Sequence, residues 1–179
     1  MDLASFLKRM FGNRADAAIY APLYAAVVAA GRRPHWYATG GVPDTFDGRF
    51  DMVSTVLALV LSRLEAEEVP GREPAARVTE LFVTDMDGQL RQKGIGDLVV
   101  GKHIGQMMSQ LGGRTAAYRE GLAPGGDLAG AIDRNIYRGT AVPAAARVHT
   151  EAALRALADG LVARDLATLL AGRIEAVPA

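Results

Sequence analysis

The sequence contains no cysteine among its 179 residues. This absence excludes disulfide bonds, thiolate metal sites, iron–sulfur clusters and a cysteine nucleophile. An excess of one charge is also missing, because 20 lysines and arginines balance 20 aspartates and glutamates. Nucleic-acid-binding proteins usually carry a basic excess that neutralises phosphates, so the balance disfavours that class.

Long apolar runs are absent as well. The most apolar run, residues 53–61, is far shorter than the roughly 20 residues needed to cross a bilayer. The N-terminus lacks the apolar middle and the small-residue cleavage site of a signal peptide. We therefore expect a cytoplasmic protein without a membrane-spanning helix. Peripheral contact with the cytoplasmic face of the inner membrane stays open.

Catalytic and cofactor motifs are equally scarce. His35, His103 and His149 are far apart, and none has a histidine or glutamate at the spacing of a helical metal site. No Gly-x-Ser-x-Gly turn occurs, and the glycines at 94 and 96 lack the third glycine of a phosphate-binding loop. We expect no cofactor, no metal and no enzymatic activity.

Helical periodicity dominates the sequence. Residues 1–14 predict an N-terminal amphipathic helix, and residues 15–179 predict one further helical domain. On the first helix, basic Lys8 and Arg9 lie beside an apolar stripe, an arrangement typical of helices that lie in an anionic membrane interface. The alternative is an ordinary first helix packed on the core of the protein. The apolar side chains with predicted membrane contact are Leu3, Phe6, Leu7, Met10 and Phe11.

Further helices are expected at residues 15–30, at 48–66, and, after a charged linker at residues 67–74, from Pro74 to about residue 92. In the first of these helices, Pro22 predicts a kink or a break near Ala21. Others are expected at 98–111, 114–119, 128–137 and 144–170, with breaks at Gly112–Gly113 and near Gly160. Residues 32–48, rich in proline and glycine, predict a loop whose length suggests a function. Because no run alternates between apolar and polar residues, we predict an all-α, single-domain irregular helical bundle.

Two clusters of aspartates attract attention. Asp44, Asp47 and Asp51 lie close together in the first, next to glycines. They could supply oxygen ligands for Mg²⁺ or Ca²⁺, but the glutamate that closes a calcium loop is missing. The simpler interpretation makes Asp47 a helix cap and Asp44 a turn residue.

The second cluster comprises Asp85, Asp87 and Asp97, with Arg91 one helical turn after Asp87. An ion pair between Asp87 and Arg91 is expected. In a metal-dependent helical enzyme, these aspartates would face the first cluster around a metal ion. A solvated acidic turn with local ion pairs is the simpler interpretation.

A basic cluster follows, made of Lys102, Arg114 and Arg119 with Tyr118 nearby. These cations could receive an acidic partner or lipid headgroups. They could equally neutralise the aspartates of the second cluster, and an internal network of that kind can still define a groove.

Together these motifs resemble the ubiquinol–cytochrome c chaperone family. They occur in the order and spacing of the family over residues 24–118, and the tail beyond residue 121 adds little. Ser54 and Thr55 differ from the family, which commonly has a histidine there. The matching motifs are residues 41–45 (GVPDT), 47–51 (DGRFD), 85–87 (DMD), 90–91 (LR), 94–98 (GIGDL), Lys102, 113–114 (GR) and 117–118 (AY).

The resemblance implies a helical assembly factor for the cytochrome bc1 complex that binds a client such as cytochrome b, with a small companion subunit as a further partner. Exposed apolar area and polar anchors suit that role better than tuned catalytic groups. The alternative is a metal-dependent helical enzyme acting on a prenyl or quinone-precursor substrate. The residues predicted to shape the client site are Trp36, Pro43, Asp44, Thr45, Asp47, Arg49, Asp85, Asp87, Arg91, Asp97, Lys102, Arg114 and Tyr118.

Overall fold

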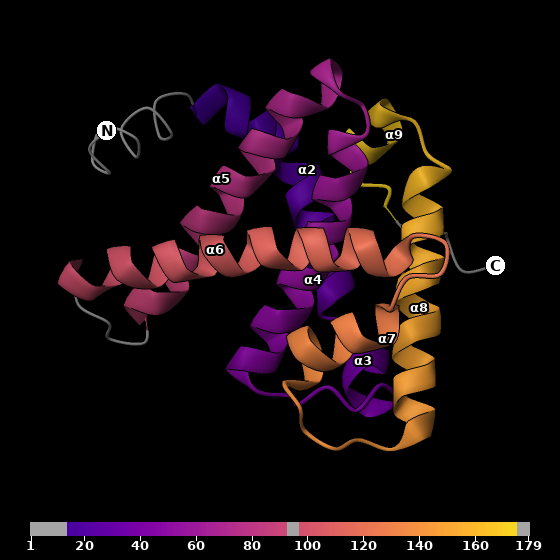
Figure 1. Cartoon of the computed structure of the whole chain (residues 1–179). Helices are drawn as coiled ribbons and strands as arrows, with labels where there is room; N and C mark the ends of the chain where they lie inside the picture. The colour runs from indigo at the N-terminus through magenta and orange to yellow at the C-terminus, as the bar shows by residue number, and fades with distance from the viewer. Residues whose placement is uncertain (1–13, 93–96, 175–179) are drawn as a thin grey trace.

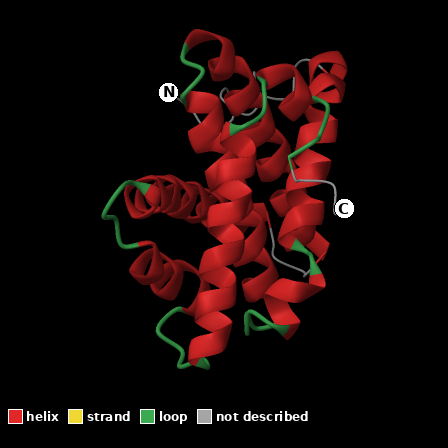
Figure 2. Cartoon of the chain, turned by 90° about the vertical axis from the view of Figure 1, so that its right-hand side faces the viewer, coloured by secondary structure: helices red, strands yellow, loops and turns green. Residues whose placement is uncertain are grey.

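The computed structural model describes residues 14–92 and 97–174. Helices make up most of this part, and Figure 2 shows helices joined by loops and no strand in it. The all-α prediction is confirmed. The N-terminal stripe at residues 3–11 lies outside the described residues, so its membrane contact and its separation from the following domain stay predictions.

The first described helices are α2 (Arg14–Gly31), the short α3 (Pro34–Ala38) and α4 (Phe46–Glu65). Two details differ from expectation. Helix α2 continues through Pro22, because packing against α4 and α5 holds it together. The expected loop is also shorter, since residues 34–38 form a helical turn that buries Trp36.

The next helices are α5 (Val69–Gln92) and α6 (Asp97–Leu122). Helix α5 begins five residues before Pro74, so the linker expected at residues 67–74 is wrong. Gly71 shows why the turn is tight: a Cβ there would overlap the carbonyl oxygen of Leu64. The break at Gly112–Gly113 is also wrong, because α6 runs through both glycines.

The chain then forms α7 (Leu128–Ile132), the π-helix η1 (Asp133–Tyr137), α8 (Ala144–Val162) and α9 (Leu166–Leu170). The last break falls after Val162, near Gly160 as expected. There, Asp165 caps α9 by accepting a hydrogen bond from the amide of Thr168 at 2.7 Å. Among the described residues, no helix is long and apolar enough to cross a membrane.

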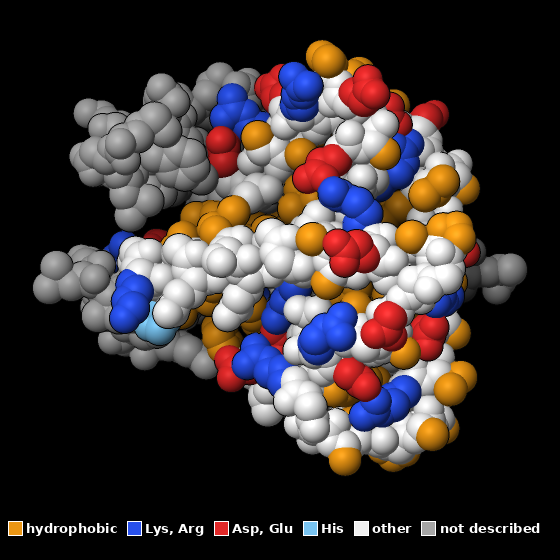
Figure 3. Space-filling model, in the orientation of Figure 1, with side chains coloured by type: hydrophobic (Ala, Val, Ile, Leu, Met, Phe, Trp, Pro, Cys, Tyr) orange, Lys and Arg blue, Asp and Glu red, His pale blue; other side chains and the backbone are white. Residues whose placement is uncertain are grey.

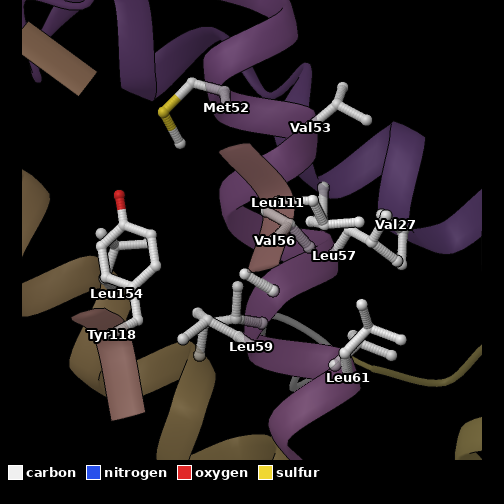
Figure 4. Packing of buried hydrophobic residues seen from close by; sticks show 14 of the residues in the cluster. Val27, Met52, Val53, Val56, Leu57, Leu59, Leu61, Leu111, Tyr118 and Leu154 are labelled. Carbon is white, nitrogen blue, oxygen red and sulfur yellow. The ribbon is translucent and has the colours of Figure 1, made fainter. Parts of the chain in front are cut away.

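Helix α4 is the centre of the fold. In Figure 1, α6 crosses it on the front, α2 lies beside it, and α8 runs along the right-hand side. Helix α4 packs against α2, α5, α6, α8 and η1, so its residues 50–61 are all buried. Figure 4 shows Val56, Leu57 and Leu59 of α4 among Val27 of α2, Leu111 and Tyr118 of α6, and Leu154 of α8. This all-round burial explains the continuous apolar run in the sequence.

Candidate functional site

A short loop between α3 and α4 (residues 39–45) carries the most distinctive motif of the sequence. Thr45 caps α4, its hydroxyl accepting a hydrogen bond from the amide of Gly48 at 3.1 Å. Gly48 cannot carry a side chain, because a Cβ would overlap the carbonyl oxygen of Pro43. The expected cap, Asp47, lies instead in the first turn, where the helix dipole favours a carboxylate. The local structure thus presents Pro43, Asp44 and Thr45 to solvent.

Beside this loop lies a cleft made of two adjoining hollows. The first, of about 410 Å³, lies between the loop, the start of α4 and the middle of α5. The second, of about 600 Å³, lies between the loop and α3. Arg32, Asp44 and Arg49 line both. The first hollow is completed by Thr45, Phe46, Phe50, Val53, Asp85, Met86 and Gln89, and the second by Pro34, Tyr37 and Ala38.

Two carboxylates of the cleft are held in different ways. Asp44 accepts a hydrogen bond from Nε of Arg49 at 2.6 Å, which lowers the pKa of this carboxyl group. Both side chains are exposed, so the pair is free to open when a ligand binds. Asp85 instead accepts hydrogen bonds from the Tyr24 hydroxyl at 2.7 Å and from Nε2 of Gln89 at 2.9 Å. Burial raises the pKa of Tyr24, which therefore stays protonated and keeps donating.

A buried ionic cluster supports the cleft from inside. The carboxylate of Asp51 is 2 % exposed and pairs with Arg114, which is 5 % exposed. Arg114 also donates to Ser54 Oγ and, at 3.2 Å, to the backbone carbonyl of Asp51. Arg138 binds the same carboxylate with Nε at 2.7 Å and a terminal nitrogen at 2.8 Å. One buried carboxylate thus joins α4, α6 and the residue after η1.

Phe50 connects this cluster to the cleft. Its ring lines the first hollow, and the guanidinium of Arg114 lies 5.5 Å from the ring centroid. The ion pair therefore braces a wall of the cleft through a cation–π contact. Sequence analysis left Asp51 and Arg138 out of the site. An aspartate two residues before the apolar run of a buried helix was a usable signal for Asp51, whereas nothing in the sequence indicated Arg138.

Three predicted contact residues are closed off from solvent. Trp36 is 2 % exposed and donates a hydrogen bond to the carbonyl of Ala30 at 2.7 Å. Tyr118 is fully buried, 3.0 Å from the hydroxyl of Thr55, and burial raises its pKa to about 12. With Arg114, these side chains stabilise the core, and no client can touch them in this structure. Trp36 and Tyr118 were mistaken for surface residues because the helical face that each occupies could not be assigned from the sequence.

The other predicted residues lie outside the cleft. Asp87 and Arg91 form the expected ion pair, 2.7 Å between carboxylate and guanidinium, on the exposed part of α5. Lys102 is exposed on α6 and lines neither hollow, and nothing is described of the Asp97 side chain. Arg119 pairs with Glu65 and not with the aspartates of α5.

Apart from the cleft, a groove of about 290 Å³ lies between α4, α5 and α6. Its apolar lining includes Leu61, Met108 and Leu111, and the exposed Glu65–Arg119 pair stands at its rim. Figure 3 shows hydrophobic side chains along the edge of α6 and few charged groups over the middle of this helix. The molecule thus offers both a polar cleft and an apolar groove.

Two histidines meet across the fold. Nδ1 of His35 in α3 lies 3.0 Å from Nε2 of His149 in α8, with the rings edge to face. Burial lowers the pKa of His35, and the neighbouring His149 and Arg33 lower it further. Sequence spacing could not reveal this contact, because the residues are 114 positions apart.

The alternative of a metal-dependent enzyme gains no support. In residues 14–92 and 97–174, no three histidine, aspartate or glutamate side chains converge as metal ligands. Asp44, Asp51 and Asp87 are each engaged by arginines instead.

The sequence and the fold match known proteins. The family model described as ubiquinol-cytochrome C chaperone matches residues 38–176, so the match extends well beyond the motifs and into the tail. A solved structure of the Cbp3 homolog from Brucella abortus is 30% identical, with a TM-score of 0.78 over 99% of this chain and 97% of that one. No curated protein matches the sequence. The chain belongs to the ubiquinol–cytochrome c chaperone family, and it is a non-enzymatic assembly chaperone of the cytochrome bc1 complex.

Proposed function

We propose that this chaperone holds a membrane subunit of the bc1 complex, such as cytochrome b, before that subunit joins its partners. The observation that carries the proposal is the convergence of the family motifs on one cleft. Asp44 and Thr45 come from one motif, Arg49 from the next and Asp85 from a third, and all four line the first hollow. A surface built from separate motifs is what recognition of a common client requires.

The two concave surfaces fit such a client. A subunit caught before assembly exposes polar loops and apolar surface together. The cleft presents charged anchors, and the groove beside α6 presents Met108, whose flexible and apolar side chain adapts to varied partners. We place the protein at the cytoplasmic face of the membrane, with the stripe at residues 3–11 as its membrane contact and a small companion subunit as a further partner.

Pull-down from detergent-solubilised membranes tests this proposal. The tagged full chain is expected to enrich cytochrome b or other bc1 subunits, identified by mass spectrometry. Arg49→Glu removes the ion pair at the cleft and places two carboxylates side by side, so it is expected to reduce this recovery. Arg72→Glu is the matched control, because Arg72 is exposed on α5 and lines neither hollow.

The outcomes separate clearly. Recovery of bc1 subunits by the wild type and by Arg72→Glu, but not by Arg49→Glu, supports client binding at the cleft. If the wild type recovers no respiratory subunit, the proposed client is wrong. Equal recovery by all three proteins would move the binding site away from the cleft. Circular dichroism on each variant checks that the fold is intact.

A further inference from the structure

Two opposite charges line the cleft without pairing with each other. Arg32 follows the end of α2, lines both hollows and is exposed. Its guanidinium forms no ion pair with any residue in the described ranges. Asp85 on α5 is held by the neutral donors Tyr24 and Gln89, and it too has no cationic partner within those ranges.

Tyr24 lies beside this part of the cleft, and both charges act on it. Its hydroxyl group donates to Asp85 at 2.7 Å. Burial raises the pKa of Tyr24, the hydrogen bond to Asp85 and the charge of Asp85 raise it further, and the charge of Arg32 lowers it. Nevertheless, the guanidinium and the carboxylate do not approach within the 4.0 Å of an ion pair. The nearby Arg49 is occupied, because it pairs with Asp44 at 2.6 Å. Arg32 and Asp85 therefore form an open pair with the hollow between them.

We propose that this gap receives a client segment that carries a basic side chain for Asp85 and an acidic side chain for Arg32. The inference rests on the proposed client function and specifies its chemistry. Charges placed in a concave site lose part of their hydration, and complementary charges on a partner restore the lost interaction. Loops of membrane proteins on the cytoplasmic side are rich in lysine and arginine, which supplies the partner for Asp85.

The competing explanation is that Arg32 and Asp85 act only on each other, and a charge swap distinguishes the two. The test uses the full chain with Arg32→Glu, Asp85→Arg and the double swap, and measures recovery of cytochrome b from solubilised membranes. If the charges face a client, each single reversal lowers recovery by about tenfold, the size of effect that a close charge pair across an interface supports. The double swap recovers no more than either single variant, because both client charges then meet like charges.

Two further sets of variants keep the test decisive. Arg32→Gln and Asp85→Asn remove charge without reversing it, and Asn retains an oxygen that can accept from Tyr24. A smaller loss, about threefold, is expected for each. The double variant Arg72→Glu with Asp159→Arg changes exposed charges elsewhere by the same amounts and should recover as the wild type does.

Restored recovery in the double swap would overturn the inference, because the pair would then matter only within the chaperone. Wild-type recovery by every charge variant would overturn it as well, while the client function would still stand. Failure of the wild type itself to recover cytochrome b would overturn both. Thermal melting of each variant excludes unfolding as the cause of a loss, and the neutral variants decide the matter where a reversal unfolds the protein.

Discussion

Replacing Asp51 with alanine should destabilise the protein more than any exposed charge substitution. The carboxylate of Asp51 is 2 % exposed and binds both Arg114 and Arg138. Its removal leaves the guanidinium of Arg114, 5 % exposed, buried without a counter-ion. Removing one partner of a buried ion pair costs about 3–5 kcal/mol, because the remaining charge stays desolvated and unpaired. For a chain of this size, the melting temperature should fall by about 6–20 °C.

The two arginines should be less sensitive, in a fixed order. Arg114→Ala leaves Asp51 with both hydrogen bonds from Arg138, so we expect a loss of about 1–3 kcal/mol. Arg138 is 50 % exposed, and Arg138→Ala leaves the Arg114–Asp51 pair intact. Because solvent screens an exposed partner, its loss should cost about 1 kcal/mol or less.

Urea unfolding followed by circular dichroism measures these differences, with an unchanged slope confirming that the unfolding transition is comparable. Asp87→Ala is the matched control, because it removes an aspartate from the exposed pair with Arg91. That loss should stay below about 1 kcal/mol. The reasoning is refuted if Asp51→Ala costs no more than Asp87→Ala, or if Arg138→Ala costs more than Arg114→Ala.

Three other perturbations test the rest of the fold. Burial raises the pKa of the Tyr118 phenol to about 12, so this group should ionise well above pH 10 in an ultraviolet titration. The stability that it contributes should be lost between pH 10 and 12. Ionisation near pH 10 in the folded protein would contradict its burial. Because the pKa of His35 is lowered in the folded protein, the unfolded chain binds this proton first as the pH falls. The free energy of unfolding should therefore decrease as the pH drops below about 6.5. His149→Gln should weaken this pH dependence in urea titrations, and an unchanged profile would count against the His35–His149 contact. Gly113→Ala should stabilise the protein by about 0.5–1 kcal/mol, because this helical position has open space around the new methyl group. Gly71→Ala should destabilise the protein, because its Cβ would meet a backbone carbonyl. Melting temperatures that shift in the same direction for both variants would refute this contrast.

Local periodicity was sufficient to predict the helical class and the central buried helix. Residues 56–61 are continuously apolar because α4 is surrounded by other helices, and a run of that kind is readable from the sequence. Helix ends were less predictable. Gly112 and Gly113 suggested a break, yet α6 passes through them, since packing against α4 and α5 outweighs the poor helix propensity of two glycines.

The candidate site was predictable only in part, because long-range contacts determine which side chains meet. Asp44, Arg49 and Asp85 belong to recognisable motifs and do share one cleft. Arg32 and Tyr24 belong to no motif and reach the cleft through the packing of α2 against α5. Nothing in local sequence relates residues that lie 61 positions apart, as Tyr24 and Asp85 do.

The structure divides the family motifs into a supporting set and a contacting set. Within residues 47–51, the side chain of Arg49 faces the cleft, while Asp51 turns inward to its two arginines. Successive residues on a helix point about 100° apart, so one short motif can supply both roles. Ser54 receives a hydrogen bond from Arg114 and so belongs to the supporting set. A substitution at Ser54 therefore changes how the cleft is braced and leaves the charges that line the cleft in place.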